Sequence, residues 1–357
     1  MKVPENIQQG LNTLIQTESK QSNIRERASE MLRALDSGNK VCLLNKAIYG
    51  LRQAGRCWNE KLSKTLLKFG AKKSSSDPCI FFKGQGQNLL LIAVYVDDIL
   101  IASQDRAETA KLKQFLSRKF EIKDLGSIKY CLGIKFNQDK NGITLKQKGY
   151  IRDILERFRM TDANTLITPL DPNVKLETKT EEDPELEKIP YQELIGSLLY
   201  LAICTRPDIS YAVSYLSQFN TCFSSIHWTA AKRVLCYLKG TIDLGITYRK
   251  TNKSVVGYVD ADWANCTTDR RSYTGYSFIL SDCPIAWESR KQKTVALSST
   301  EAEYMALTEA VRQATYLRRF LLEIGLTKLA EIKVFCDNHG ARKLAEDPVF
   351  HNRTKHY

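Results

Sequence analysis

The chain has 357 residues, of which 43% are hydrophobic and 26% charged, and this balance excludes a disordered or fibrous protein. It leaves room for two or three globular domains. Lys and Arg number 53 against 40 Asp and Glu, and the net charge of +13 favours a nucleic-acid partner because basic surface displaces phosphate counterions, although solubility alone would also account for it.

The first predicted elements are mostly helical. Apolar residues at helical spacing predict a peripheral helical segment from Gln8 to Asp36, followed by Gly38 as a helix stop. The next stretch, Val41–Leu67, predicts a short strand, a glycine-containing turn at residues 49–51 and a helix whose apolar face packs on a sheet.

A hairpin is the clearest predicted element of the first half. Leu89–Val96 is an unbroken apolar run, and Ile99–Ala102 is a second one after two aspartates. We therefore expect a buried hairpin with two carboxylates at its tip. A helix over Ala107–Lys119 and strands between Ile128 and Leu145 are expected to follow.

The second half divides at a polar stretch. Residues 165–189 are rich in Pro, Thr and Glu, which predicts a linker or exposed loop. Residues 191–239 are expected to be mostly helical. From about Ser254 onward, strands and helices alternate, which is typical of an α/β unit.

Cysteine spacing and hydropathy indicate the compartment. The ten cysteines are scattered, and no two have the C-x-x-C spacing of a zinc or redox site, so we expect most of them to be buried thiols in a reducing compartment. The N-terminus has no apolar signal core, and no run approaches the roughly 20 apolar residues that span a bilayer. We expect a soluble intracellular protein without a membrane partner.

The two aspartates of the predicted hairpin, Asp97 and Asp98, suggest a metal site. Buried carboxylates without a cation lose several kcal/mol of solvation, and Mg²⁺ is their natural partner because it prefers oxygen ligands. The alternative for the dipeptide alone is a turn exposed to water.

Three further carboxylates stand at the ends of predicted elements in the last unit. Asp260 lies near the end of a strand, with Asp262 on the same face by the strand period of two. Asp337 ends another strand. Glu303 lies in the first turn of a helix, on the face that covers the sheet, after a capping box formed by Ser298 and Glu301. Taken singly, each acid also fits a turn or a helix cap.

The first of these patterns resembles a known family. The run Tyr-Val-Asp-Asp at 95–98 resembles the polymerase motif of reverse transcriptases, and residues 45–54 resemble a template- and nucleotide-positioning segment of copia-type retrotransposon Pol polyproteins. The resemblance implies that Asp97 and Asp98 are catalytic and hold Mg²⁺ (or Mn²⁺). It also implies nucleotide or template contacts for Tyr49, Gly50, Gln53 and Tyr95.

The second pattern resembles the ribonuclease H of the same retrotransposons. The matching text is Asp-Ala-Asp-Trp-Ala at 260–264, Ser-Ser-Thr-Glu-Ala-Glu-Tyr at 298–304 and Cys-Asp-Asn at 336–338. The resemblance implies that Asp260, Glu303 and Asp337 hold two Mg²⁺ ions that activate a water to cut the RNA strand of an RNA–DNA hybrid. It further implies that His351 shuttles protons or assists product release.

The expected fold class combines α/β and α+β: a partial reverse-transcriptase palm, a helical connection and a ribonuclease H-like mixed sheet with helices. The segments are a divergent helical one at 1–39, a partial palm and thumb at 40–164, a linker and connection region at 165–253, and a ribonuclease H-like domain at 254–357. In the connection region, Arg233 and Lys239 are expected to follow backbone phosphates.

The expected function is that of a retrotransposon-derived polymerase and hybrid ribonuclease fragment. Compared with the family, the first polymerase aspartate and the last ribonuclease H acid have no counterpart, so we expect a chain truncated at both ends with impaired activity. The alternatives are a non-catalytic nucleic-acid-binding protein retained by its host, and a pseudogene product that never accumulates. Expected partners are RNA, DNA and their hybrid, and intact Pol or Gag particles in trans, in the cytoplasm or the nucleus.

Overall fold

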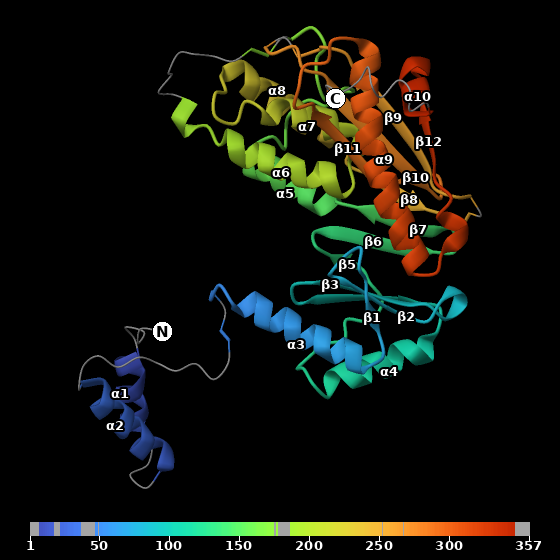
Figure 1. Cartoon of the computed structure of the whole chain (residues 1–357). Helices are drawn as coiled ribbons and strands as arrows, with labels where there is room; N and C mark the ends of the chain where they lie inside the picture. Colours follow the sequence, from blue (N-terminus) through green and yellow to red (C-terminus); the bar gives the residue numbers. More distant parts are fainter. Residues whose placement is uncertain are drawn as a thin grey trace. The chain divides into compact units, whose positions relative to one another are not determined.

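The computed structural model describes residues 7–17, 22–36, 47–48, 50–174, 176–177, 186–251, 253–266 and 268–346. Contacts divide the chain into two compact units, Met1–Ala71 with Val94–Ile99, and Lys72–Ala93 with Leu100–Tyr357. Helices and three four-stranded sheets make up the described residues (Figure 1). The expected mixture of helix and sheet is therefore confirmed.

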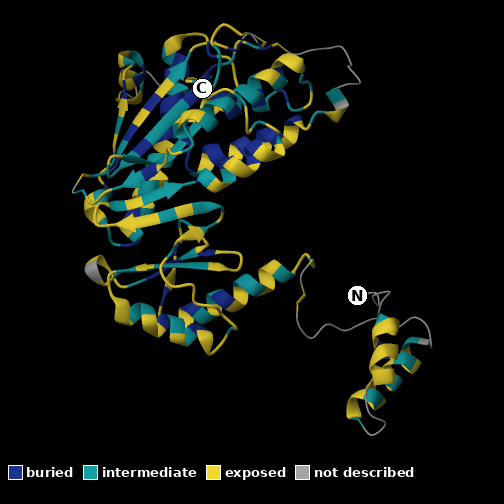
Figure 2. Cartoon of the chain, turned by 180° about the vertical axis from the view of Figure 1, so that it is seen from behind, coloured by how far each residue is buried: buried dark blue, intermediate teal, exposed yellow. Residues whose placement is uncertain are grey.

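The described residues of the first unit form the helices α1 (Ile7–Thr17), α2 (Asn23–Asp36) and α3 (Ala54–Lys68). Helices α1 and α2 contact each other and are largely exposed (Figure 2). The predicted helical segment at 8–36 is thus confirmed as two helices. The predicted helix after residue 51 is also confirmed, whereas the strand predicted near Val41 lies outside the described residues.

The predicted hairpin forms one side of the first sheet, whose order is β1 (Lys72–Lys73), β2 (Ile80–Lys83), β3 (Leu90–Tyr95) and β4 (Asp98–Ser103). Strand β3 alternates between buried and half-buried residues. The prediction that both strands are buried is wrong for β4, which is half-exposed because it lies at the edge of the sheet. Helix α4 (Arg106–Ser117) follows as predicted.

A second sheet joins distant parts of the sequence. Its order is β5 (Tyr130–Cys131), β6 (Ile134–Asp139), β7 (Gly142–Lys146) and β8 (Ile246–Tyr248), and neighbouring strands are antiparallel. The strands predicted up to residue 145 are confirmed. Strand β8 comes about a hundred residues later, so segments 40–164 and 165–253 share this sheet.

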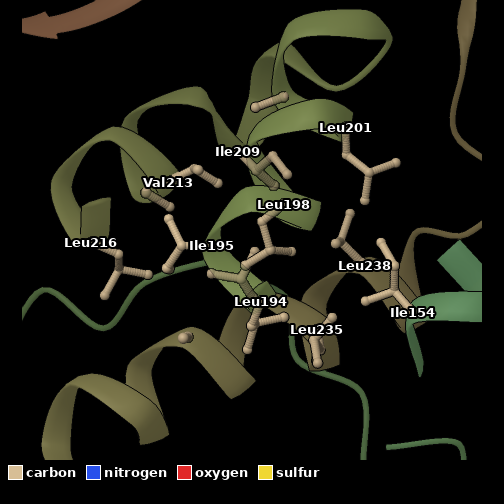
Figure 3. Close-up of a cluster of buried hydrophobic side chains, with 14 of the residues drawn as sticks. Ile154, Leu194, Ile195, Leu198, Leu201, Ile209, Val213, Leu216, Leu235 and Leu238 are labelled. Atoms are coloured by element: carbon tan, nitrogen blue, oxygen red, sulfur yellow. The ribbon is translucent and has the colours of Figure 1, made fainter. Parts of the chain in front are cut away.

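Four helices build the largest apolar core: α5 (Lys148–Arg157), α6 (Tyr191–Cys204), α7 (Ser210–Ser217) and α8 (Ser225–Gly240). Figure 3 shows side chains from these helices, among them Ile154, Leu198 and Leu235, converging on one another. The helical prediction for 191–239 is confirmed. Burying such side chains stabilises the fold by about 1.5–3 kcal/mol each.

The predicted loop at 165–189 is only partly exposed. Leu176 is 2% exposed and Leu170 packs against the helical core, so the prediction of an exposed loop is wrong for these positions. The reason is the run of spaced leucines, which covers apolar surface that would otherwise face water. Residues 178–185 lie outside the described residues.

The third sheet carries the last predicted unit. Its order is β11 (Cys283–Lys291), β10 (Tyr273–Leu280), β9 (Val256–Asp262) and β12 (Lys333–Cys336). Strands β9, β10 and β11 are antiparallel, while β12 runs parallel to β9. Helix α9 (Ser299–Glu323) connects β11 to β12 and packs on β9, and α10 (His339–Glu346) follows β12 (Figure 1).

The remaining elements are short 3₁₀ helices: η1 (Gly86–Asn88), η2 (Leu186–Lys188), η3 (Pro207–Ile209) and η4 (Thr327–Leu329).

Candidate functional sites

Two of the predicted acids meet at one end of the third sheet. Val259 of β9 is in register with Cys336 of β12, and Asp260 and Asp337 are the residues that directly follow them in the sequence. Because neighbouring strands lie about 4.8 Å apart, their carboxylates start from adjacent backbone positions. Both residues are exposed.

Helix α9 brings Glu303 close to Asp260 and Asp337. The Ser298 hydroxyl accepts a hydrogen bond from the Glu301 backbone N–H at 3.2 Å and starts the helix, as predicted. The second half of the predicted capping box differs, because Glu301 Oε2 accepts from the Leu297 N–H at 2.6 Å. Glu303 lies one residue beyond the first turn and is only 7% exposed.

The surroundings of Glu303 disfavour its charge. Burial first, and then the nearby charge of Asp260, raise the pKa of Glu303 to about 7. The Ala261 backbone N–H opposes this shift by hydrogen bonding to the carboxylate, and Asp337 adds to it. The Oε2 atom of Glu303 is buried and has no hydrogen-bond partner among the described residues. A buried orphan oxygen beside two further carboxylates fits a cation site.

Sequence reasoning missed one member of this cluster. Ligand atoms of Glu303, Cys336 and Asp337 all lie within 4.8 Å of one another. Cys336 is buried, and burial followed by the two carboxylates raises the pKa of its thiol. The available signal was its position, since Cys336 immediately precedes Asp337 on a predicted strand.

Asp262, which the strand period placed on the same face as Asp260, makes a contact within the sheet. Its carboxylate accepts a hydrogen bond from the Tyr273 backbone N–H on the neighbouring strand β10. It therefore holds the open end of the β9–β10 pair. Among the described residues, neither Asp262 nor Asp260 is part of the group formed by Glu303, Cys336 and Asp337, although the charge of Asp260 acts on Glu303.

The second predicted site is the tip of the β3–β4 hairpin. Tyr95, Val96, Asp97 and Asp98 are all exposed. Val96 has φ of +51°, a left-handed conformation that is rare for a β-branched residue. The Trp58 indole N–H of helix α3 donates to the Val96 carbonyl at 2.7 Å. The tip is thus held in a strained conformation with its aspartates open to solvent.

The remaining predicted contacts are only partly described. Gly50 has φ of +89°, which favours glycine, and lies in an exposed turn before α3. Gln53 is exposed at the start of that helix. Tyr49 and His351 lie outside the described residues.

The basic residues expected to follow phosphates make contacts within the protein. Arg233 Nη2 donates to the Thr168 hydroxyl at 2.9 Å, and Lys239 Nζ donates to the Ala163 carbonyl at 2.8 Å. These bonds attach the segment after α5 to helix α8. Both side chains thus have a structural use, and their expected contact with phosphates stays a prediction.

Sequence reasoning also missed a buried ion pair. Arg206 is 1% exposed, and its guanidinium donates to Asp208 at 2.7 Å and to the Thr241 hydroxyl at 2.6 Å. The Tyr237 hydroxyl donates to the same aspartate at 2.8 Å. Burial raises the pKa of Asp208, but its bonds with Arg206 and Tyr237 outweigh burial and hold that pKa below its ordinary value.

Comparison with known families matches residues 33–172 to the family described as "Reverse transcriptase (RNA-dependent DNA polymerase)". Over 324 residues, 88% of this chain, the sequence is 41% identical to the retrovirus-related Pol polyprotein from transposon TNT 1-94 of Nicotiana tabacum. It is also 41% identical, over 326 residues and 90% of this chain, to the retrovirus-related Pol polyprotein from transposon RE1 of Arabidopsis thaliana.

A shorter relative matches over most of its own length. It is a transposon Ty5-1 protein of Saccharomyces cerevisiae, 36% identical over 270 residues, which cover 74% of this chain and 87% of that protein. The chain spans about a quarter of the two longer polyproteins, 24% and 22% of their lengths. Among the described residues, none of the helices has both the length and the apolar character needed to cross a membrane.

Proposed function

Since this chain belongs to the reverse transcriptase family of copia-type retrotransposon Pol polyproteins, we propose that it carries two sites of nucleic-acid processing. The first is a polymerase site around Asp97 and Asp98, in a palm and thumb segment at 40–164. The second is a ribonuclease H site around Asp260, Glu303 and Asp337, in a domain at 254–357. Residues 165–253 connect the two, and residues 1–39 are a divergent helical segment.

The acid cluster is the observation that carries the ribonuclease proposal. Glu303 is buried, its pKa is raised to about 7, and one of its oxygens lacks a hydrogen-bond partner among the described residues. Such a carboxylate is unfavourable unless a cation or a proton neutralises it. Three carboxylates match the oxygen ligands that Mg²⁺ and Mn²⁺ prefer. When bound by Asp260, Glu303 and Asp337, these ions supply an activated water and neutralise charge on the attacked phosphate.

The three carboxylates of this site would have different roles. Glu303 is fixed by helix α9 and buried, so it provides a rigid anchor at the back of the site. Asp260, near the end of β9, and Asp337, directly after β12, are exposed, so they would face an approaching nucleic-acid backbone. The substrate that fits the family and the positive net charge is an RNA–DNA hybrid.

The polymerase proposal is supported by the hairpin tip. The left-handed Val96 turns the backbone sharply before two exposed aspartates, and Trp58 holds its carbonyl. Asp97 and Asp98 would hold the divalent cations that polymerases use. Gly50, Gln53 and Tyr95 would contact the nucleotide or the template. Tyr49 and His351 keep the roles expected from sequence, as proposals.

The proposed partners are RNA, DNA and their hybrid, together with the other parts of Pol and Gag particles. Action in cytoplasmic virus-like particles or in the nucleus is proposed on the same basis. Comparing the cleavage rate of this chain with that of the full polyprotein tests the expectation of impaired activity.

The ribonuclease proposal is tested with the full chain on a labelled RNA–DNA hybrid in Mg²⁺ or Mn²⁺. We expect cleavage of the RNA strand, and a loss of at least about a hundredfold in Glu303→Gln. Glu309→Gln is the matched control, because Glu309 lies on the same helix but pairs with Arg290 and Arg312 at the surface. Equal activity in the wild type and Glu303→Gln would contradict the proposal.

The polymerase proposal needs its own assay. Because impaired activity is expected, primer extension on an RNA template by the wild type should be weak. Asp97→Asn is expected to abolish it and to leave hybrid cleavage intact. The net charge of +13 also favours the alternative of a non-catalytic nucleic-acid-binding protein. That alternative would be supported by two results together. The wild type would show neither synthesis nor cleavage, and it would bind the hybrid tightly, with the same affinity in Asp97→Asn and Glu303→Gln.

A further inference from the structure

Cys336 is the member of the acid cluster that the proposed function does not use. Its sulfur and the carboxylate oxygens of Glu303 and Asp337 lie within 4.8 Å of one another. Cys336 and Glu303 are both buried, and Glu303 Oε2 has no hydrogen-bond partner among the described residues. The soft sulfur of Cys336 thus lies beside the hard carboxylate oxygens of Glu303 and Asp337.

We propose that Glu303, Cys336 and Asp337 form a site for a thiophilic divalent cation such as Zn²⁺, and that this ion, when bound, competes with Mg²⁺ for Glu303 and Asp337. The inference rests on the proposed function in one respect, since it uses two of the same carboxylates. It adds a ligand type and an inhibitory cation that Mg²⁺-dependent hydrolysis does not require.

The chemistry of the ligands separates the two kinds of cation. Mg²⁺ prefers six oxygen ligands in octahedral geometry, so a thiol contributes nothing to its binding. Zn²⁺ accepts sulfur and carboxylate oxygen together, in tetrahedral geometry. It also binds such mixed sites more tightly than the earlier divalent metals do. Cys336 therefore selects for the softer ion.

The spacing of the three ligand atoms suits a small tetrahedral ion. Two ligands at Zn–S and Zn–O distances of about 2.3 and 2.0 Å lie about 3.5 Å apart across a tetrahedral angle. Ligand atoms within 4.8 Å therefore need to close by no more than about 1.3 Å, which side-chain rotation supplies. A fourth position stays open for water.

Binding of the cation releases protons. The Cys336 thiol loses its proton to solvent when its sulfur becomes a ligand, and any proton on Glu303 leaves in the same way. No oxidation or reduction is involved. The bound ion satisfies the buried Glu303 oxygen that otherwise lacks a hydrogen bond, and it occupies carboxylates that Mg²⁺ needs.

The competing explanation is that Cys336 is an ordinary core thiol, since it also packs in the apolar cluster of the third sheet. Cys266 provides a matched control. It is also buried, but it lies beside Lys291, whose positive charge repels a cation, and it belongs to no group of three close ligands among the described residues.

Cobalt is the probe, because Co²⁺ replaces Zn²⁺ and gives a sulfur-to-metal absorption band only when a thiolate is bound. We expect the full wild-type chain to develop this band on Co²⁺ titration, and Zn²⁺ to abolish it. Cys336→Ser is expected to lose the band, and Cys266→Ser to keep it. Zn²⁺ affinity should fall at least about tenfold in Cys336→Ser, the loss typical even for an outer partner of a ligand.

Mn²⁺ binding separates the failure of this inference from the failure of the proposed function. Cys336→Ser should bind Mn²⁺ as the wild type does, which also shows that the variant is folded. A band that is unchanged in Cys336→Ser, or a wild type that binds Mn²⁺ but gives no band with Co²⁺, overturns the thiol site alone. A wild type that binds neither ion overturns both.

Discussion

Asp260 and Asp337 follow the last register pair, Val259 with Cys336, of two parallel strands, so the two residues occupy neighbouring backbone positions at one end of the β9–β12 pair. Glu303 adds a third carboxylate from helix α9. Without a cation, the charges of Asp260 and Asp337 disfavour an ionised Glu303. Burial, which is the larger cause, and this repulsion together raise the pKa of Glu303 to about 7. The cluster therefore lowers the stability of the cation-free protein.

The first prediction is that Glu303→Gln stabilises the chain in the presence of a chelator. In the unfolded chain Glu303 ionises near 4.5, but in the folded chain only near 7. The folded state therefore loses stability, relative to the unfolded one, as pH rises through this window. Glutamine never ionises, so the gain in unfolding free energy of Glu303→Gln over the wild type should be near zero below pH 4.5 and on the order of 3 kcal/mol above pH 7.

Urea unfolding with EDTA at a series of pH values measures this difference. Glu309→Gln, at a half-buried position of the same helix where the carboxylate pairs with Arg290 and Arg312, should show no gain that grows through the same pH window. A Glu303→Gln variant that is less stable than the wild type near pH 8 would mean that hydrogen bonds to the ionised carboxylate outweigh its burial, against the prediction.

Much of this acid cluster could be predicted from sequence, for a physical reason. Strand ends and helix starts are marked by local patterns, and those patterns placed Asp260, Glu303 and Asp337 at element ends. The contribution of Cys336 could not be predicted, because it depends on the register between β9 and β12. The role of Asp262 depends likewise on the pairing of β9 with β10.

The fold shows the same division between local and distant information. Most helices and the hairpin follow from periodicity. The joining of β7 to β8, about a hundred residues apart, and the burial of Leu176 do not, because both depend on which distant surfaces meet. Arg206 was not predicted to be buried, since arginine is rarely buried unless it is paired, and its partners are known only from the structure.

The second prediction concerns that buried arginine. Arg206→Met removes the cation that Asp208 and Thr241 contact, and it leaves Asp208 in a partly buried position without its main partner. We expect the unfolding free energy to fall by about 3–5 kcal/mol, as for other broken buried pairs. Chemical unfolding, followed by tryptophan fluorescence, measures it.

Arg233→Met is the control for the arginine prediction. The Arg233 side chain bonds the Thr168 hydroxyl and lies 3.6 Å from Asp171, but it is 26% exposed. Its loss should lower stability by about 1 kcal/mol or less. Equal losses for the two variants would show that burial of Arg206 contributes little.

The third prediction concerns the strained hairpin tip. Val96 has φ of +51°, and the left-handed conformation costs about 1–2 kcal/mol for a residue of this kind. Asparagine tolerates this conformation, so Val96→Asn should raise the unfolding free energy by about 1 kcal/mol. Val96→Thr keeps the branched Cβ and should give no gain. Similar stabilities for the Asn and Thr variants in urea unfolding would argue against strain at this position.

The last prediction concerns a carboxylate that links helix α9 to the segment between strands β1 and β2. Glu323, at the end of helix α9, accepts hydrogen bonds from the Ser74 hydroxyl at 2.7 Å, the Ser75 N–H at 2.6 Å and the Ser76 N–H at 3.4 Å. Burial raises the pKa of Glu323, but these bonds outweigh burial and lower the pKa below its ordinary value. Glu323→Gln weakens them by removing the negative charge.

We expect Glu323→Gln to lower the unfolding free energy by about 2 kcal/mol near neutral pH, the range for hydrogen bonds to charged groups. Because the folded-state pKa is lowered, this contribution is present above the ordinary pKa of glutamate and is lost as pH falls through the folded value. The difference in unfolding free energy between variant and wild type should therefore disappear in acid.

Hydrogen exchange at the Ser75 and Ser76 amides should accelerate in Glu323→Gln. Glu331→Gln, which changes an exposed carboxylate before β12, should alter neither the unfolding free energy nor the exchange. Unchanged exchange at both serines in Glu323→Gln would show that the contact between the β1–β2 turn and helix α9 does not depend on this carboxylate.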